Sequence, residues 1–257
     1  MGKVIAIANQ KGGVGKTTTQ VNLSACVASL DRKILSIDMD PQANATSGLG
    51  LMPQEGKSIY DVISGDVSAS DCILSTCVDT LDLLPADIRL AASEVELVSR
   101  ENREYILRAV LGDVLDSYDY LFIDCPPSLG LLTINALCAA DWVIVPIQCE
   151  YYALEGVGQL MNTVRRVQRG LNARLSIEGV VLTMLDGRTN LGIQVVQEVK
   201  RHFRNQVYST IIPRNIRLSE APSHGLPIHL YDSHSMGAEA YKELATEFLQ
   251  RCEGRKA

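Results

Sequence analysis

Short apolar runs alternate along this chain with longer stretches of helical length. The runs are rich in β-branched and other apolar side chains, and they occupy residues 4–8, 33–38, 81–84, 118–124, 142–147, 179–185 and 207–212. Runs that are apolar throughout predict strands covered on both faces, and helical segments between them predict parallel neighbours joined by right-handed crossovers. The pattern therefore predicts an α/β fold, a doubly wound and mostly parallel sheet flanked by helices.

Length and composition agree with this pattern. The chain has 257 residues, of which 46% are hydrophobic and 5% aromatic. That length suits one large core, and the low aromatic share favours helices on a parallel sheet over a sandwich of short strands. Segment 49–80 is the least regular and predicts surface helices and loops, whereas residues 235–251 predict a helix with an ordinary core-facing stripe. Since no repeat or linker divides the sequence, we expect residues 1–257 to form a single domain.

Signals for export and membrane insertion are missing from the sequence. The chain runs from Met1 directly into an apolar strand, without the basic and long apolar regions of a signal peptide. The longest apolar runs have the length of strands, well short of the roughly 20 residues that cross a bilayer. The seven cysteines are scattered, and Cys72 and Cys77, the closest pair, have no neighbours that would complete a zinc site. We expect a cytoplasmic protein with reduced thiols and no membrane partner.

Charge is distributed unevenly. The formal net charge is −6, which by itself argues against a nucleic-acid-binding protein. Between residues 160 and 217, however, ten Lys or Arg residues stand against three Asp or Glu residues. This local balance of +7 leaves −13 for the rest of the chain. The basic region therefore keeps binding to a polyanion open.

A glycine-rich segment follows the first predicted strand and precedes a helix-length segment that runs to about residue 30. It reads Lys11, Gly12, Gly13, Val14, Gly15, Lys16, Thr17 and Thr18. Glycines let backbone amides point inward, the helix amino terminus adds positive potential, and Lys16 supplies a charge to the β- and γ-phosphates of ATP. Thr17 would ligate Mg²⁺. We predict a phosphate loop in a variant form, because Gln10 stands where the ordinary pattern has glycine.

Carboxylates end two of the other predicted strands. Asp38 ends the second strand, Asp40 follows shortly after it, and Asp124 ends the fourth. An Asp at the tip of a strand beside the phosphate loop can hold a water bound to Mg²⁺, which is the role we expect for Asp124, with Asp38 assisting. Asp40 lies one step further out, where a carboxylate can orient the attacking water. Any one of these residues is otherwise a helix cap or a turn residue.

These motifs resemble the ParA/Soj branch of the deviant Walker-A ATPases. The resemblance rests on the loop of residues 11–18 and on segments 38–42, 44–50, 123–129, 148–156, 185–192, 213–215 and 219–225. It covers nearly the whole chain, and its motifs are specific. It implies a P-loop ATPase that acts in chromosome or plasmid partitioning.

The resemblance also implies how ATP controls the family's assembly. The extra lysine, here Lys11, reaches across a homodimer to the phosphates of the other subunit's nucleotide, so that ATP is sandwiched between two chains. A second cation near the γ-phosphate favours ATP over ADP and counters charge in the transition state. The catalytic residues implied are Lys11, Lys16 and Asp40. Pro213 and Asn215 are expected to border the adenine, with Met184 packed on its face.

Members of this family bind double-stranded DNA without sequence preference in the ATP state. The basic region supplies the candidates Arg188, Lys200, Arg201, Arg214 and Arg217. A dimer doubles the phosphate contacts, so that contacts weak in one subunit become useful affinity. Solvated helix faces are the alternative for any one of them, and Arg165, Arg166 and Arg169 fit that alternative better.

Partners follow from the family alone. The resemblance implies a ParB-like protein whose basic amino-terminal peptide stimulates hydrolysis, a replication initiator in some members, slow hydrolysis without a partner, and nucleoid association in the ATP state. The main alternative is a MinD-like membrane-associated positioning ATPase, which carries an amphipathic basic tail. Residues 252–257 have no apolar face long enough to insert into a membrane, which favours the DNA hypothesis. A nitrogenase-reductase-like or dethiobiotin-synthetase-like enzyme is the other alternative. The first would need cluster-binding cysteines, but the cysteines form no recognisable cluster pattern. The second would need a small-molecule pocket, for which the sequence gives no sign.

Overall fold

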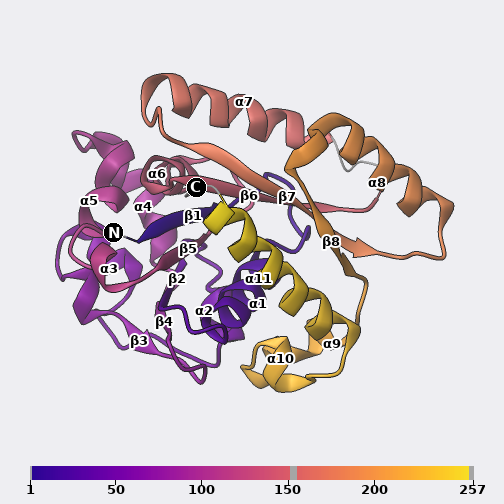
Figure 1. Ribbon diagram of the computed structural model, residues 1–257. Coiled ribbons are helices and arrows are strands. Elements are labelled where there is room, and N and C mark those ends of the chain that lie inside the picture. The colour runs from indigo at the N-terminus through magenta and orange to yellow at the C-terminus, as the bar shows by residue number, and fades with distance from the viewer. Residues whose placement is uncertain (1, 151–154, 255–257) are drawn as a thin grey trace.

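The computed structural model describes residues 2–150 and 155–254 (Figure 1). Residues 151–154 of the 148–156 motif and residues 255–257 of the carboxyl-terminal tail lie outside these described residues. Within the two described ranges, no helix combines the length and the apolar composition that crossing a bilayer requires.

A single sheet of eight strands, counted over the described residues, runs through the middle of the molecule (Figure 1). Its strands are β1 Lys3–Ile7, β2 Ile34–Asp38, β3 Leu74–Ser75, β4 Leu81–Leu84, β5 Tyr120–Asp124, β6 Trp142–Gln148, β7 Ser176–Leu185 and β8 Val207–Pro213. The spatial order is β3-β4-β2-β5-β1-β6-β7-β8, and every neighbouring pair is parallel except β3 with β4. The mostly parallel sheet predicted from the sequence is confirmed.

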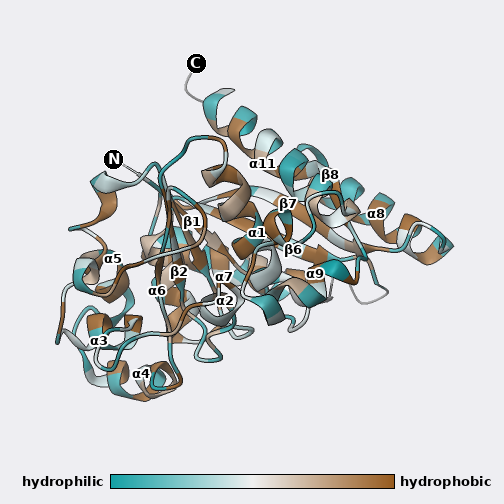
Figure 2. Cartoon of the chain, turned by 90° about the horizontal axis from the view of Figure 1, so that it is seen from below, coloured by the Kyte–Doolittle hydropathy of each residue, from teal (hydrophilic) through white to brown (hydrophobic). Residues whose placement is uncertain are grey.

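Helices cover both faces of this sheet, as the same prediction requires. They are α1 Lys16–Ala28, α2 Asn44–Gly48, α3 Ile59–Ser64, α4 Leu90–Glu96, α5 Ile106–Val110, α6 Leu131–Ala139, α7 Glu155–Gly170, α8 Asn190–Phe203, α9 Arg217–Glu220, α10 Ile228–Tyr231 and α11 Met236–Gly254. One apolar core joins the strands to α1 and α11, and a second joins them to α6, α7 and α8. Figure 2 shows apolar residues concentrated on the central strands and banded with polar residues along α8 and α11.

The predicted strands agree closely with the observed ones. The seven runs correspond to β1, β2 and β4 to β8, with ends displaced by at most three residues. The difference is β3, which lies in segment 49–80 and pairs antiparallel with β4. A strand of two residues is too short to show alternating apolar and polar positions, and the pattern therefore missed it.

The sheet order decides where ligands can bind. β1 lies between β5 and β6, so that β2 to β5 lie on one side of it and β6 to β8 on the other. Where the strand order of a parallel sheet reverses in this way, a crevice forms outside the carboxyl ends of the strands. β2 and β5 are in register from Ile34 with Tyr120 to Asp38 with Asp124, so both carboxylates end at this edge.

Candidate functional site

The loop between β1 and α1 has the backbone conformation of a phosphate-binding loop. Gly13 and Gly15 have φ angles of 73° and 87°, a left-handed region that glycine occupies without a steric penalty. Gly15 is the N-cap of α1, so the free amides of the first helical turn face the loop. Val14 is buried beneath, and its carbonyl accepts a hydrogen bond from Thr183 Oγ1 at 2.8 Å. The loop is thereby fixed to the neighbouring strand β7.

Lys16 is the first residue of α1 and is buried, with 6% of its surface exposed. Its Nζ donates a hydrogen bond to the Lys11 carbonyl at 3.2 Å. Burial lowers the pKa of this ammonium, while Asp124, Cys125 and Asp40 act in the opposite direction. A buried cation beside inward-facing amides is suited to binding an anion.

Asp124 and Thr17 meet at the end of β5. Thr17 Oγ1 donates to Asp124 Oδ2 at 2.6 Å. The other oxygen, Oδ1, is buried without a hydrogen-bond partner among the described residues. Burial, and next the neighbouring Asp38, raise the pKa of Asp124 well above its usual range. An unpartnered carboxylate oxygen beside a hydroxyl is a donor set that fits a small divalent cation.

Asp38 lies on the adjacent strand and is fully buried. Its Oδ2 accepts hydrogen bonds from the Thr46 amide at 2.9 Å and the Thr46 hydroxyl at 2.7 Å, and its Oδ1 accepts from the Asp40 amide at 3.1 Å. Burial raises the pKa of Asp38 to about 6. Both oxygens therefore already serve protein donors, and the metal-assisting role expected for Asp38 stays a prediction.

Asp40 borders the hollow beside the phosphate loop. It is 7% exposed, and its Oδ1 accepts from the Gln42 amide at 3.0 Å. The hollow has a volume of about 310 Å³ and is lined by Gly12, Gly13, Gly15, Lys16, Thr17, Thr18, Asp40, Gln42, Asn44, Pro127 and Met184. The second strand end thus lies beside the phosphate loop, as the sequence predicted.

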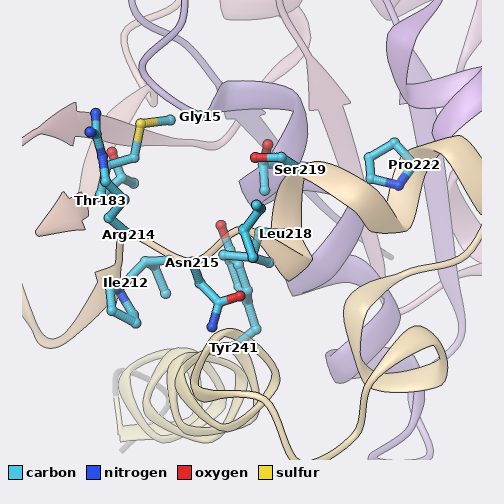
Figure 3. Close-up of a pocket in the computed structure, with 13 residues that line it drawn as sticks. Gly15, Thr183, Ile212, Arg214, Asn215, Leu218, Ser219, Pro222 and Tyr241 are labelled. Atoms are coloured by element: carbon cyan, nitrogen blue, oxygen red, sulfur yellow. The ribbon is translucent and has the colours of Figure 1, made fainter.

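A second cavity of about 490 Å³ adjoins this hollow (Figure 3). It is lined by Gly15, Thr18, Thr183, Met184, Ile212, Pro213, Arg214, Asn215, Ile216, Leu218, Ser219, Pro222 and Tyr241. Gly15, Thr18 and Met184 line both spaces. One apolar and one polar compartment therefore share a wall, an arrangement that suits a flat base joined to a phosphate chain.

The structure brings together the residues predicted around the base. Met184, Pro213 and Asn215 all line the larger cavity. Met184 has a φ angle of 53°, a strained conformation for a residue with a side chain, and its Cε lies near Gly15. Asn215 Oδ1 accepts from the Arg217 amide at 2.8 Å, which fixes the turn that carries it.

Sequence reasoning missed several lining residues, among them Thr183, Leu218 and Tyr241. Thr183 interrupts an otherwise apolar strand, and that interruption was a usable signal. Tyr241 belongs to the core-facing stripe of α11, and its hydroxyl lies 3.2 Å from Thr19 Oγ1. Nothing in the stripe distinguishes it from core, because only the packing of α11 on α1 brings it to the cavity.

The five basic residues expected to bind DNA are all exposed and lie on or beside α8, β8 and α9. Four form ion pairs: Arg188 with Asp186 at 2.8 Å, Arg201 with Glu198 at 2.8 Å, Arg214 with Glu150 at 3.5 Å, and Arg217 with Glu220 at 2.9 Å. Lys200 has no ion-pair partner within residues 2–150 and 155–254. Exposed ion pairs contribute little free energy, so phosphate groups can compete for these arginines.

The chain is similar to known proteins over nearly its full length. A family model described as an AAA domain matches residues 2–177. The sporulation initiation inhibitor protein Soj of Bacillus subtilis is 61% identical over 96% of this chain and 98% of its own length. The chromosome partitioning protein ParA of Myxococcus xanthus is 51% identical over 98% of this chain and 89% of its own length.

The chain is also similar to solved structures. Crystal structures of cobyrinic acid a,c-diamide synthase from Mycobacterium smegmatis, one with ADP and magnesium and one with an ATP analogue and magnesium, superpose with a TM-score of 0.87. They are 38% identical to this chain and cover 99% of it and 97% of the other chain. With its phosphate loop, strand-end carboxylates and full-length relatives, the chain belongs to the ParA/Soj family of chromosome-partitioning ATPases.

Proposed function

We propose that this protein is a Mg²⁺-dependent ATPase that dimerises on ATP, binds DNA nonspecifically in that state and acts in chromosome or plasmid partitioning. The observation that carries the proposal is the unpartnered Asp124 Oδ1 beside Thr17 and the phosphate loop. This arrangement fits the nucleotide and magnesium bound by the relative from M. smegmatis. We propose further that residues 1–257 form a single ATPase domain.

The nucleotide would be held in two compartments. The amides of residues 12–18 and the buried Lys16 ammonium would bind the phosphates. The larger cavity would take the base between Met184 and the turn of Pro213 and Asn215. Its mostly apolar lining suits the flat face of adenine.

Thr17 and Asp124 are the residues that would hold Mg²⁺. A bound Mg²⁺ supplies positive charge that neutralises the phosphate oxygens. Asp38 would support this site from the next strand, while its oxygens hold Thr46 and the Asp40 amide. The fit rests on oxygen donors alone, which is the chemistry that this ion prefers.

Asp40 is assigned to hydrolysis. Its carboxylate borders the hollow beside the phosphate loop, and the Gln42 amide donates to one carboxylate oxygen, which fixes the orientation of the group. Such a carboxylate can align the attacking water with the γ-phosphate. Lys16 would stabilise the developing charge from its own subunit, and Lys11 from the other subunit.

The switch between states follows from Lys11. Its ammonium has no hydrogen-bond or ion-pair partner within the described part of the chain. A cation left free on the phosphate loop supports its use on a second subunit's γ-phosphate. Dimerisation would then place two sets of Arg188, Lys200, Arg201, Arg214 and Arg217 on one assembly and strengthen DNA binding.

Partners and location are proposed on the strength of the family. A ParB-like protein would stimulate the slow basal hydrolysis, a replication initiator would be a further partner, and the ATP state would be cytoplasmic and nucleoid-associated. The name of the M. xanthus relative, chromosome partitioning protein ParA, supports a partitioning role.

Binding to nonspecific duplex DNA tests the proposal. We would measure it with ADP, with ATP, and with ATP on Asp40→Ala, each at two salt concentrations. The expected result is salt-sensitive binding with ATP only, prolonged in Asp40→Ala because hydrolysis no longer ends it. Absence of binding in every nucleotide state would refute the DNA switch, and ATP-dependent binding to anionic liposomes instead would favour a MinD-like membrane role.

A further inference from the structure

Asn9 lies at the point where β1 leaves the sheet and the phosphate loop begins. It is buried, with 3% of its surface exposed, and none of the roles above uses it. The Ala8 amide still donates to the Ile144 carbonyl at 3.2 Å, which continues the β1–β6 pairing. Further along β6, Asn9 Nδ2 donates a hydrogen bond to the Pro146 carbonyl at 2.7 Å. The Asn9 side chain thus takes the place of the main-chain amide that would make the next hydrogen bond between β1 and β6.

The other end of the same side chain holds Lys11. Asn9 Oδ1 accepts a hydrogen bond from the Lys11 amide at 3.1 Å. The Lys11 carbonyl in turn accepts from Lys16 Nζ at 3.2 Å. Both backbone groups of Lys11 are therefore held within the subunit, whereas its ammonium is left without a partner among residues 2–150 and 155–254.

The chemistry of these contacts requires an amide. The Pro146 carbonyl can only accept and the Lys11 amide can only donate, which fixes the orientation of the Asn9 side chain. Leucine has a similar shape but neither function. An aspartate can make both contacts only while its carboxyl carries a proton, and burial favours that neutral form.

We propose that Asn9 is a positioning residue for Lys11, which it holds so that the ammonium faces away from its own subunit. This inference rests on the proposed function, because it assigns Lys11 to the nucleotide of a second copy. Fixing a group before association reduces the ordering cost of binding. Loss of Asn9 should therefore weaken the ATP dimer more than it weakens nucleotide binding by one subunit.

The test compares Asn9→Leu with Lys11→Ala and with Asn172→Leu, all on an Asp40→Ala background that preserves ATP. Asn172 is a matched control, since it is also buried and donates to the Leu137, Cys138 and Ala140 carbonyls away from the loop. The measurements are the dimer dissociation constant with ATP by sedimentation, the affinity of the monomer for ADP, and hydrogen exchange of the Lys11 amide.

We expect Asn9→Leu to weaken the ATP dimer about tenfold or more, since both hydrogen bonds of the Asn9 side chain are lost in each subunit. Its ADP affinity should change by less than about threefold because the loop amides and Lys16 remain. Exchange of the Lys11 amide should accelerate in Asn9→Leu and not in Asn172→Leu. An equal loss of ADP affinity and dimerisation would overturn the inference, as would an unchanged dimer.

Asn9→Asp gives a second readout if the leucine variant does not fold. Protonation lets its carboxyl donate to the Pro146 carbonyl, so its dimerisation relative to the parent should improve as pH falls from 8 to 6. A deficit that is constant across this range contradicts the positioning role. If Lys11→Ala dimerises with ATP as well as the parent, the assignment of Lys11 to the second subunit's nucleotide fails, and with it this part of the proposed function. If Lys11→Ala abolishes the dimer and both Asn9 variants behave like the parent, only the inference about Asn9 fails.

Discussion

Single buried polar side chains join parts of the site that are far apart in the sequence. Thr183 holds the phosphate loop through the Val14 carbonyl. The Gln20 side-chain amide donates to the Ser36 hydroxyl beneath α1. Thr46 donates to Asp38 and also accepts from the Ala86 amide at 3.0 Å, so one hydroxyl connects β2, α2 and the segment after β4. Groups buried in this way are costly to leave unpaired.

Thr46→Val tests this at the scale of one hydroxyl. The substitution keeps the shape but leaves Asp38 Oδ2 and the Ala86 amide without this partner. We expect the free energy of unfolding to fall by roughly 2 kcal/mol or more, the typical cost of stranding buried hydrogen-bonding groups. Urea denaturation measures it. Ser47→Ala on the exposed side of α2 is the control and should stay within about 0.5 kcal/mol, and equal effects of the two would contradict the role.

The pairing of strands β7 and β8 depends on side-chain contacts as well as on main-chain hydrogen bonds, because the register between the two strands is irregular. The buried Tyr208 hydroxyl donates to Glu178 on β7. The Arg251 guanidinium of α11 lies 4.0 Å from the centre of the Tyr208 ring. A Cβ on Gly179 would lie 2.5 Å from a ring carbon of Tyr208. Close approach of β7 and β8, which carry Met184 and Pro213, therefore requires glycine at position 179.

Gly179→Ala should disturb this pairing. The added methyl group has no room, and overpacking of a core costs about 1–3 kcal/mol. Gly158→Ala is the matched control, because nothing lies within 4 Å of its added Cβ. At this exposed position of α7, alanine should raise stability by roughly 0.5–1 kcal/mol. Thermal or urea unfolding measures the stability of both variants. If Gly179→Ala does not change stability, β7 and β8 can move apart enough to accommodate the methyl group.

The contact between α10 and α1 should make stability depend on pH. Burial, followed by the nearby Lys242, lowers the pKa of His229, whose ring lies 3.3 Å from Ser29 Oγ. The unfolded state therefore binds more protons below pH 6.5, and stability that is full above this value is lost as pH falls through the lower folded pKa. His229→Gln should flatten the fall of the urea midpoint between pH 7 and 5. An identical slope in both proteins would refute this contribution.

Across the whole molecule, charge is segregated. The basic region of residues 160–217 contains α8 and ends at the first residue of α9, whereas α3 and α4 lie toward the opposite end of the sheet (Figure 1). The residues outside the basic region carry a net charge of −13, which repels DNA wherever these residues face it. Binding of DNA by a monomer should consequently be weak, and under the proposed function a dimer that aligns two basic surfaces would supply the missing affinity.

The salt dependence of DNA affinity measures how many phosphate contacts the proposed dimer makes. Lys200→Ala should flatten the slope of log affinity against log salt by about two for a dimer, because each lost phosphate contact removes about 0.9. Arg169→Ala on α7 is the control and should leave the slope unchanged. The loss should be the same for DNA of any sequence. Equal slopes for Lys200→Ala and the unmodified protein would remove Lys200 from the DNA surface.

Much of the fold and part of the site could be predicted from the sequence. The apolar runs predicted seven of the strands, since their periodicity depends on burial that repeats along the chain. The phosphate loop was recognisable because glycine and lysine occur together between a strand and a helix. Met184, Pro213 and Asn215 came from the family resemblance, and the structure places all three on one cavity.

The sequence by itself determined the strands, the phosphate loop and the carboxylates at the strand ends, because each depends on neighbours within a few residues. Only the tertiary structure decided which of those carboxylates has an unpartnered oxygen beside Thr17, and it alone brought Tyr241 to the cavity. It also joined Asn9 to Pro146, 137 positions away. Strand order and register set such contacts, and they follow from the packing of both cores at once, which no local pattern encodes.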